Sequence, residues 1–384
     1  MVNICIGVIS LFVNVFLLAQ IFVLSGESFV ALGVFSLLRF IFLFVFQIVG
    51  SVLCKKITPL FVIRLSTVLA CLLLILIIFL QDHLIQFYML FGLLWGCVAG
   101  LFLCASQFLV SSNADKEGAL SFISIQVFFF SAANLVFPVT LGAVIYYGNF
   151  LITSAVILAI GVLQMLATLM IKNAKKDDAR KQLDIKGYFK AIKKAGHLRP
   201  GLRLWFIIFL AGFSDTIAIL ATALVMLTFS THLSLGVLTS FVYVFVMIIS
   251  RLYKKISALR KYLYASAVIL PLAGILLLVV FGDMSSVVLF MVFYRSTRNV
   301  IFMEEESTRL NAAKYWKGDA FIMESNLFYE GALAAGAVLS ATLVIVIGTF
   351  YAQWLVILLL AITVSAFSLH GILLKLWQRR NAIP

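Results

Sequence analysis

Twelve long apolar stretches constrain this chain more than any other feature of its sequence. Each is long enough to cross the hydrocarbon core of a bilayer, which takes about 20 residues of α-helix. Backbone groups in lipid must be hydrogen-bonded within their own segment, so the stretches are expected to be helical. The sequence therefore predicts an all-α polytopic membrane protein with 12 transmembrane helices, at about residues 3–24, 28–54, 60–80, 85–111, 119–147, 150–171, 204–229, 231–252, 262–281, 284–304, 319–347 and 351–376.

The composition excludes a soluble domain. Of 384 residues, 36 are Phe; 64% are hydrophobic and only 11% are charged. The first apolar stretch begins almost at Met1 but is too long for the core of a signal peptide and lacks a small-residue cleavage site. We expect it to be a retained helix.

The basic residues predict the orientation. Of 29 Lys and Arg residues, 26 fall on one side of the predicted spans, and the opposite loops carry only Glu27, Asp82 and Asp283 as charges. Loops rich in Lys and Arg stay in the cytoplasm. We therefore expect a multi-pass protein of the plasma membrane with both termini cytoplasmic. The net charge of +14 is then a signal of topology and not of nucleic-acid binding.

A short basic turn occurs twice. The sequence LCKKITPL at residues 53–60 recurs as LYKKISAL at 252–259, so that Lys55, Lys56, Lys254 and Lys255 mark two equivalent cytoplasmic turns. Weaker matches follow at an offset of 200 residues, such as Gly148 with Gly348. This pattern favours a duplication over two unrelated basic loops. It predicts an N-terminal six-helix bundle at 1–171 and a C-terminal one at 204–384, related by pseudo-symmetry.

The segment 172–203 is predicted to be a cytoplasmic linker. Within it Ile185, Tyr188, Phe189 and Ile192 follow helical spacing with lysines between them, which is typical of a basic amphipathic helix. Contact with an anionic lipid surface and packing against the bundle are both compatible with this pattern.

Ionisable residues inside the spans are the candidates for function, because a charge at the centre of a transmembrane helix costs about 2.5–3.5 kcal/mol. Carboxyl groups that can accept protons in a cavity are Asp215, Glu330 and Glu324, and their candidate partners are Arg39, Arg295, Arg298, Asn299 and Asn326. A carboxyl–Arg pair that changes partner between states can couple ion and solute movement. The alternative is a fixed buried network that holds the C-terminal helices together.

Other polar residues are candidates with less specific roles. Possible cavity-lining residues are Asn14, Trp95, Gln126 and Asn134, although each can equally hydrogen-bond two helices together. The run Glu304–Glu306 beside Arg309 is expected at the cytoplasmic mouth, as a solvated or latch network. The five cysteines and four histidines have no metal-ligand spacing, so we expect no metal site.

Twelve helices in two halves, a long basic central loop and the repeated turn together resemble the major facilitator superfamily. The turn of that family usually reads Gly-x-x-x-Asp-Arg-x-Gly-Arg-Arg. Here Gly50 and the basic Lys55 match, but Cys54 replaces the Asp, which puts the usual cytoplasmic latch in doubt. The stretch 137–142 (FPVTLG) is similar to the Gly-Pro-x-x-Gly-Gly signature of antiporters, although a plain helix bend is an alternative.

The resemblance implies a secondary transporter that works by alternating access. We expect proton-coupled export of an amphipathic compound by antiport; the alternatives are a proton-coupled importer of a small anionic solute, and a transporter-like sensor or scaffold. No nucleotide-binding loop and no catalytic motif is present, so an enzyme is not expected and no cofactor is implied. The expected partners are the lipid bilayer, a small-molecule substrate and a proton or other ion gradient, without nucleic acid, and the expected state is a monomer.

Overall fold

The computed structural model describes residues 2–113, 116–171, 183–317, 321–350 and 353–381, with their side chains except at 110–113, 116–129, 254, 257, 310–317, 322, 353 and 381. Every regular element in these ranges is a helix. The helices are α1 (Val2–Leu11), a π-helical turn η1 (Phe12–Leu17), α2 (Leu18–Leu24), α3 (Phe29–Lys56), α4 (Pro59–Phe79), a 3₁₀ turn η2 (Gln81–His83), α5 (Leu84–Asn113), α6 (Lys116–Tyr147), α7 (Phe150–Met170), α8 (Ile185–Lys194), α9 (Leu198–Ser214), α10 (Thr216–Phe229), α11 (His232–Lys255), α12 (Ser257–Phe281), α13 (Met284–Lys317), α14 (Ile322–Gly348) and α15 (Gln353–Asn381).

The prediction of a polytopic helical membrane protein is confirmed. Within the described ranges, 11 helical segments are long and apolar enough to cross a membrane. The predicted span 284–304 is also helical and lies in α13. It falls outside those 11 because α13 carries several charged residues, among them Arg295, Arg298 and Glu305. These charges make α13 the helix most occupied with polar contacts.

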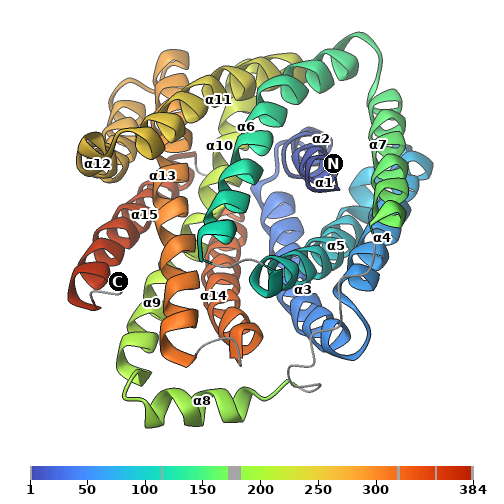
Figure 1. The fold of residues 1–384 in the computed structure, drawn as a ribbon. Coiled ribbons are helices and arrows are strands. Elements are labelled where there is room, and N and C mark those ends of the chain that lie inside the picture. The colour runs from blue at the N-terminus through green and yellow to red at the C-terminus, as the bar shows by residue number, and fades with distance from the viewer. Residues whose placement is uncertain (1, 114–115, 172–182, 318–320, 351–352, 382–384) are drawn as a thin grey trace.

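The packing of the helices repeats along the chain. Contacts within α1–α7 have counterparts within α9–α15: α3 on α5 matches α11 on α13, α4 on α7 matches α12 on α15, α1 on α6 matches α9 on α14, and α1 on α7 matches α9 on α15. Figure 1 shows the helices up to α7 gathered on one side of the molecule and those from α9 on the other. The two groups meet mainly where α3 packs on α14 and α6 packs on α11.

Small residues allow close approach at α6 and α11. A Cβ on Gly236 would stand 2.3 Å from the carbonyl oxygen of Pro138, and a Cβ on Gly142 would stand 2.6 Å from that of His232. Because Pro138 interrupts the hydrogen-bonding pattern of α6, the amide of Val139 donates to Ser240 Oγ across the interface (3.2 Å). The antiporter-like stretch thus lies where α6 and α11 meet, whichever function it serves.

A glycine stripe fixes α5 on α3. Gly92, Gly96 and Gly100 recur every four residues on α5, and a Cβ on any of them would stand 2.3–2.6 Å from a backbone oxygen of α3. Small residues at this spacing let two helix backbones approach closely in a membrane, where dispersion contacts drive packing. This stripe determines which face of α3 remains free for α14.

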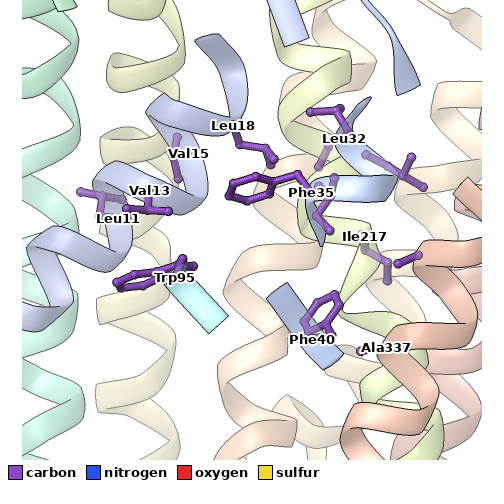
Figure 2. Close-up of a cluster of buried hydrophobic side chains, with 14 of the residues drawn as sticks. Leu11, Val13, Val15, Leu18, Leu32, Phe35, Phe40, Trp95, Ile217 and Ala337 are labelled. Atoms are coloured by element: carbon purple, nitrogen blue, oxygen red, sulfur yellow. The ribbon is translucent and has the colours of Figure 1, made fainter. Parts of the chain in front are cut away.

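An apolar core fills the middle of the bundle. Figure 2 shows part of it, where Phe35 and Phe40 of α3 meet Ile217 of α10 and Ala337 of α14. All four side chains are buried. Polar and charged groups within this layer are therefore confined to a few places.

Two helices depart from regular α-geometry. The first span contains the π-helical turn η1, and the seventh span breaks between α9 and α10 at Asp215. At the break, the amide of Asp215 bonds to the Gly212 carbonyl (3.0 Å) and the amide of Ala218 to the Asp215 carbonyl (3.3 Å), in 3₁₀ fashion. A 3₁₀ turn inside a helix often marks a functional hinge. The predicted span 204–229 is accordingly two helices with a carboxylate at their junction.

The linker helix α8 lies across one end of the bundle, beneath α9, α13 and α14 in Figure 1. We call this the basic end, since the turn after Lys56 and the C-terminal Arg379 and Arg380 also lie there. Tyr188 and Ile192 are buried, and Tyr188 stacks against Phe321 and Phe328. The lysines of α8 are exposed on its other faces. Packing against the bundle is therefore observed for Tyr188 and Ile192, whereas Ile185 and Phe189, the other two apolar residues of the pattern, are exposed.

Candidate functional site

A cavity of about 470 Å³ lies between the two groups of helices, and its wall includes residues from both. Its residues come from the end of α9 at the Asp215 break, from the middle of α11 and α15, and from the basic halves of α5, α13 and α14. The cavity therefore extends from the middle of the bundle towards the basic end. Most of its polar lining is Ser106, Gln107, Ser131, Asn134, Ser214, Asp215, Tyr243, Arg298, Asn299, Glu305, Glu306, Arg309, Asn326, Glu330 and His370. Ligand sites in helical bundles are commonly of this kind, concave with a few converging polar groups.

Six of the predicted residues lie on this cavity wall. They are Asp215, Glu330, Arg298, Asn299, Asn326 and Asn134. Asn326 and Glu330 lie four residues apart on α14 and so share its cavity side, as the consecutive residues Arg298 and Asn299 do on α13.

The remaining predicted residues lie elsewhere. Arg39, Arg295, Glu324, Asn14 and Trp95 are not part of the described cavity wall. The side chain of Gln126 lies outside the described residues, as does that of Lys254, whereas Lys56 and Lys255 are exposed at the ends of α3 and α11. The cavity is thus built mainly from the second group of helices.

Glu330 of α14 is held from both sides of the molecule. Its Oε1 accepts from Arg309 Nη2 (2.5 Å) and from Gln107 Nε2 (3.2 Å), and its Oε2 accepts from Gln47 Nε2 (3.1 Å). Arg309 belongs to α13, whereas Gln47 and Gln107 belong to α3 and α5. Three donors, one of them a guanidinium, satisfy a buried carboxylate that would otherwise be costly in a membrane. The same contacts join the two groups of helices at the cavity.

Asp215 at the α9–α10 break pairs with Arg298 of α13. Both side chains remain partly exposed to the cavity, at 22% and 33% respectively. Arg39 of α3 interacts electrostatically with both of them and stacks beside the Phe40 ring, while its Nε has no hydrogen-bond partner among the described residues. Arg295 makes no ion pair in the described part of the chain, so the two predicted arginines of α13 have different environments.

The run Glu304–Glu306 was expected to form a solvated or a latch network. Glu305 and Glu306 line the cavity, and the Arg309 side chain is only 6% exposed, bonding Glu306 Oε1 at 2.8 Å as well as Glu330. Glu304 faces another way, accepting from Tyr253 and Gln378. The solvated alternative is not observed for Glu305 and Glu306, because α13 continues as one helix to Lys317 and keeps the run within the bundle.

The structure also shows functional candidates that the sequence did not single out. His370 of α15 lines the cavity with Nε2 at 3.4 Å from Glu305 Oε2. Tyr243 of α11 also lines it. A lone histidine or tyrosine in an apolar helix carries no signal of its own, so neither was predictable without the helix packing.

At the basic end, Glu324 forms a second link between the two groups of helices. Its Oε1 accepts from Lys55 Nζ of α3 (2.5 Å) and from the amide of Asp184 (3.0 Å), the residue that caps α8. The Glu324 side chain is only 1% exposed. Cys54 stands where the resembled turn motif has an Asp. Glu324 of α14 supplies a carboxylate to this turn instead.

Asn14 and Trp95 form a helix–helix contact. Trp95 Nε1 donates to Asn14 Oδ1 (3.1 Å), and Asn14 Nδ2 donates to Ser10 Oγ (2.9 Å). Asn14 lies in the π-helical turn η1, which directs it towards α5. Of the two roles that the sequence left open, joining helices is the observed one. Similarly, His232 of α11 meets Gln20 of α2 (2.7 Å) at the end opposite to the basic end.

No group of three or more His, Cys, Asp or Glu side chains placed to hold a metal ion occurs among the described residues. The polar groups of the cavity are instead two guanidinium groups, four carboxylates, an imidazole and several amides and hydroxyls. This set can bind polar solutes and exchange protons.

No protein-family model matches the sequence, and no curated protein matches it either. Solved structures do match over nearly the whole chain. They include a variant of the E. coli fucose:proton symporter FucP (TM-score 0.65, 13% identity, 98% of this chain and 97% of that one) and the human organic anion transporter MFSD10 (0.66, 14%, 97% and 97%). A third belongs to the proton-dependent oligopeptide transporters (0.70, 12%, 99% and 98%). All three are transporters, and over nearly its whole length the chain shares their fold, as its resemblance to the major facilitator superfamily led us to expect.

Proposed function

We propose that this protein is a secondary active transporter that moves a small organic solute by alternating access through the cavity between its helix groups. The observation that carries the proposal is Glu330, a buried carboxylate on the cavity wall that is bound by both groups at once. Alternating access needs contacts between the halves that can break and re-form, and hydrogen bonds across a polar cavity have that property.

The moving units in this proposal are residues 1–171 and 204–384, joined by the cytoplasmic linker 172–203. The repeated packing of α1–α7 and α9–α15 supports this division, as does the concentration of basic residues at one end. With the basic end in the cytoplasm, the protein is a multi-pass protein of the plasma membrane with both termini inside.

Two carboxyl–arginine pairs are the proposed coupling elements. Asp215 pairs with Arg298 at a helix break, and Glu330 shares Arg309 with Glu306. Each pair has a further charged group nearby with which it can exchange partners, Arg39 in the first case and Glu306 in the second. A proton gradient is the proposed drive, because carboxyl groups and an imidazole are the ion-binding groups of the cavity.

The cavity favours an amphipathic cargo, and export by proton antiport is the proposed direction. Phe130, Phe302, Phe367 and Tyr243 contribute aromatic surface beside the polar groups. The alternative, import of a small anionic solute, has less support. Both arginines of the described cavity wall are already paired with carboxylates, and carboxylates outnumber them.

The test uses purified protein in liposomes with an imposed pH gradient, and follows ethidium as a cationic aromatic probe and carboxyfluorescein as an anionic one. We expect gradient-driven ethidium movement by the wild type, and its loss in Asp215→Asn and Glu330→Gln. Asp82→Asn, an exposed carboxylate at the opposite end, serves as the matched control. If both cavity variants keep full gradient-driven transport, the coupling assignment fails. Movement of carboxyfluorescein alone would favour the anionic alternative, and movement of neither probe would favour a sensor or scaffold.

A further inference from the structure

Glu305 is a carboxylate without a basic residue of its own. It is 4% exposed and lines the cavity from α13. Among the described residues, no lysine or arginine lies within ion-pair distance of it, and its only titratable partner is His370. An unpaired carboxylate buried in a membrane protein is costly as an anion, so a positive charge is expected to join it.

His370 faces this carboxylate with its hydrogen-bonding capacity unused. The residue is 1% exposed on α15, and neither ring nitrogen makes a hydrogen bond of good geometry within the described part of the chain. Its Nε2 is 3.4 Å from Glu305 Oε2. A buried polar group without a partner needs an explanation, and an exchangeable ligand of this site is a direct one.

The other charges around Glu305 do not neutralise it. Arg309 is occupied by Glu306 and Glu330, at 2.8 and 2.5 Å, and Arg298 is occupied by Asp215. The charged or titratable groups that act on Glu305 are Arg298, Glu306 and Arg309 of its own helix, Tyr264 of α12, Asp215 at the α9–α10 break, Glu330 of α14 and His370 of α15. Three of these are carboxylates and two are guanidinium groups, and Arg309 is the charge that acts most strongly on Glu305. The surroundings therefore keep one more negative than positive charge, without an ion pair to Glu305 itself.

We propose that Glu305 and His370 form the site that binds and releases one proton in each transport cycle. This inference rests on the proposed function, and it names the atoms that carry the coupling ion. A proton from cavity water attaches to Glu305 Oε2 or His370 Nε2, and the resulting hydrogen bond joins the two. The charge of the pair changes from −1 to 0 on binding, and it returns to −1 when the proton leaves to water on the other side of the membrane.

The division of roles follows from the contacts. Asp215 and Glu330 each form an ion pair with an arginine, so they serve as switchable ion pairs. Glu305 instead faces an imidazole, which carries no positive charge unless it is protonated, so this pair can take up one proton that either group can hold. The proton belongs to the two groups jointly, as in other closely coupled titrating pairs.

The test measures the protonation of Glu305 directly and needs no knowledge of the cargo. Purified wild-type protein in liposomes is treated with dicyclohexylcarbodiimide, which attaches to protonated carboxyl groups in apolar surroundings, from about pH 5 to about pH 9. Tandem mass spectrometry of the peptide that contains Glu304–Glu306 then locates the label. We expect labelling at Glu305 that increases as pH falls and exceeds labelling at Glu330 by roughly tenfold, because Glu330 is bound by Arg309 and by two amide side chains.

Substitutions distinguish protonation of the Glu305–His370 pair from protonation of the neighbouring carboxylates. Glu305→Gln should abolish the label on this peptide, and His370→Gln should displace the midpoint of labelling at Glu305 by about one pH unit or more. Glu304→Gln is the matched control, since Glu304 lies on the same helix but bonds Tyr253 and Gln378 away from the cavity, and it should leave the midpoint unchanged. Absence of label at Glu305 while Glu330 is labelled, or a midpoint unaffected by His370→Gln, would overturn the proposal. Because labelling does not depend on transport, either result is distinct from a failure of the transport assay.

Discussion

At the residue scale, the two arginines of the described cavity wall differ in their ion pairs. Arg309 pairs with two carboxylates, whereas Arg298 pairs with one. One guanidinium serves two buried carboxylates, Glu306 and Glu330, from a side chain that is almost wholly enclosed. Removing one member of a buried ion pair strands the other, which costs more than the pair itself contributes. The loss in free energy of unfolding caused by each substitution therefore depends on how many buried charges it leaves without a counter-ion.

Arg309→Gln should destabilise the protein more than Glu330→Gln does. The first substitution strands two carboxylates, whereas the second leaves Arg309 still paired with Glu306. Loss of a buried pair's partner costs about 3–5 kcal/mol, so we expect a clear fall in the unfolding temperature of Arg309→Gln and a fall of less than half that size in Glu330→Gln. The measurement is thermal unfolding in detergent, followed by tryptophan fluorescence. Equal falls in the two variants would contradict the sharing of Arg309.

The sequence predicted this site in part. Asp215, Arg298 and Glu330 were found because a charge in an apolar helix is conspicuous, and helical spacing indicated which polar neighbours share its face. Glu305 was set aside because three consecutive acids near a helix end are typical of a solvated segment. His370 gives no signal until α15 is packed beside α13.

At the scale of elements, the linker helix α8 shows a basic amphipathic segment that uses its apolar face within the protein. Tyr188 is enclosed by Phe321 and Phe328, and Asp184 at the start of α8 donates its amide to Glu324. Burial raises the pKa of Tyr188 to about 12, so its hydroxyl stays neutral at physiological pH and adds no charge beneath the helix. The helix is thereby attached to α14 at the point where Lys55 of α3 also binds.

Tyr188→Ala should release α8 from the basic end, because it removes the aromatic ring that anchors the helix. Burial of a large side chain is worth about 1.5–3 kcal/mol, so its loss should shift a short helix towards an undocked state. We expect trypsin to cleave after Lys190, Lys193 or Lys194 about tenfold faster than in the wild type, as a loss of about 1.4 kcal/mol implies. Tyr188→Phe keeps the ring and should be cleaved at the wild-type rate. Equal cleavage of the Ala and Phe variants would show that the ring does not hold α8.

The helices were predictable as elements, whereas their irregularities were not. Apolar length alone located the spans and the short turns between them. The break at Asp215 and the π-helical turn at Phe12–Leu17 depend on tertiary contacts, such as the bond between Asn14 and Trp95, which compete with regular helical hydrogen bonds. The glycine stripe of α5 was visible in the sequence as Gly-x-x-x-Gly-x-x-x-Gly, but only the structure identifies α3 as its partner.

At the scale of the whole molecule, the repeated basic turn and the repeated packing both relate the helices α1–α7 to the helices α9–α15 in the same order. The turns end α3 and α11, which occupy corresponding positions in the two groups, since α3 packs on α5 as α11 packs on α13. The same two helices also form the contacts between the groups, α3 with α14 and α11 with α6. A motion that separates the groups must therefore change contacts along these four helices and leave the contacts within each group intact.

This distinction gives a prediction for crosslinking. Gln20 of α2 and His232 of α11 meet at 2.7 Å across the two groups, at the end opposite to the basic end, and the alternating-access proposal requires them to separate. In a variant whose five native cysteines are replaced, Gln20→Cys with His232→Cys joined by a short bis-thiosulfonate reagent should lose transport of the probe, and a reductant should restore it. The matched control joins Thr67→Cys of α4 to Gln164→Cys of α7, whose side chains meet at 3.1 Å within one group. That crosslink should leave transport at the uncrosslinked level, because a rigid unit is unaffected by an internal link. Transport that survives the first crosslink, or that both crosslinks abolish equally, would show that the two groups do not move as separate bodies.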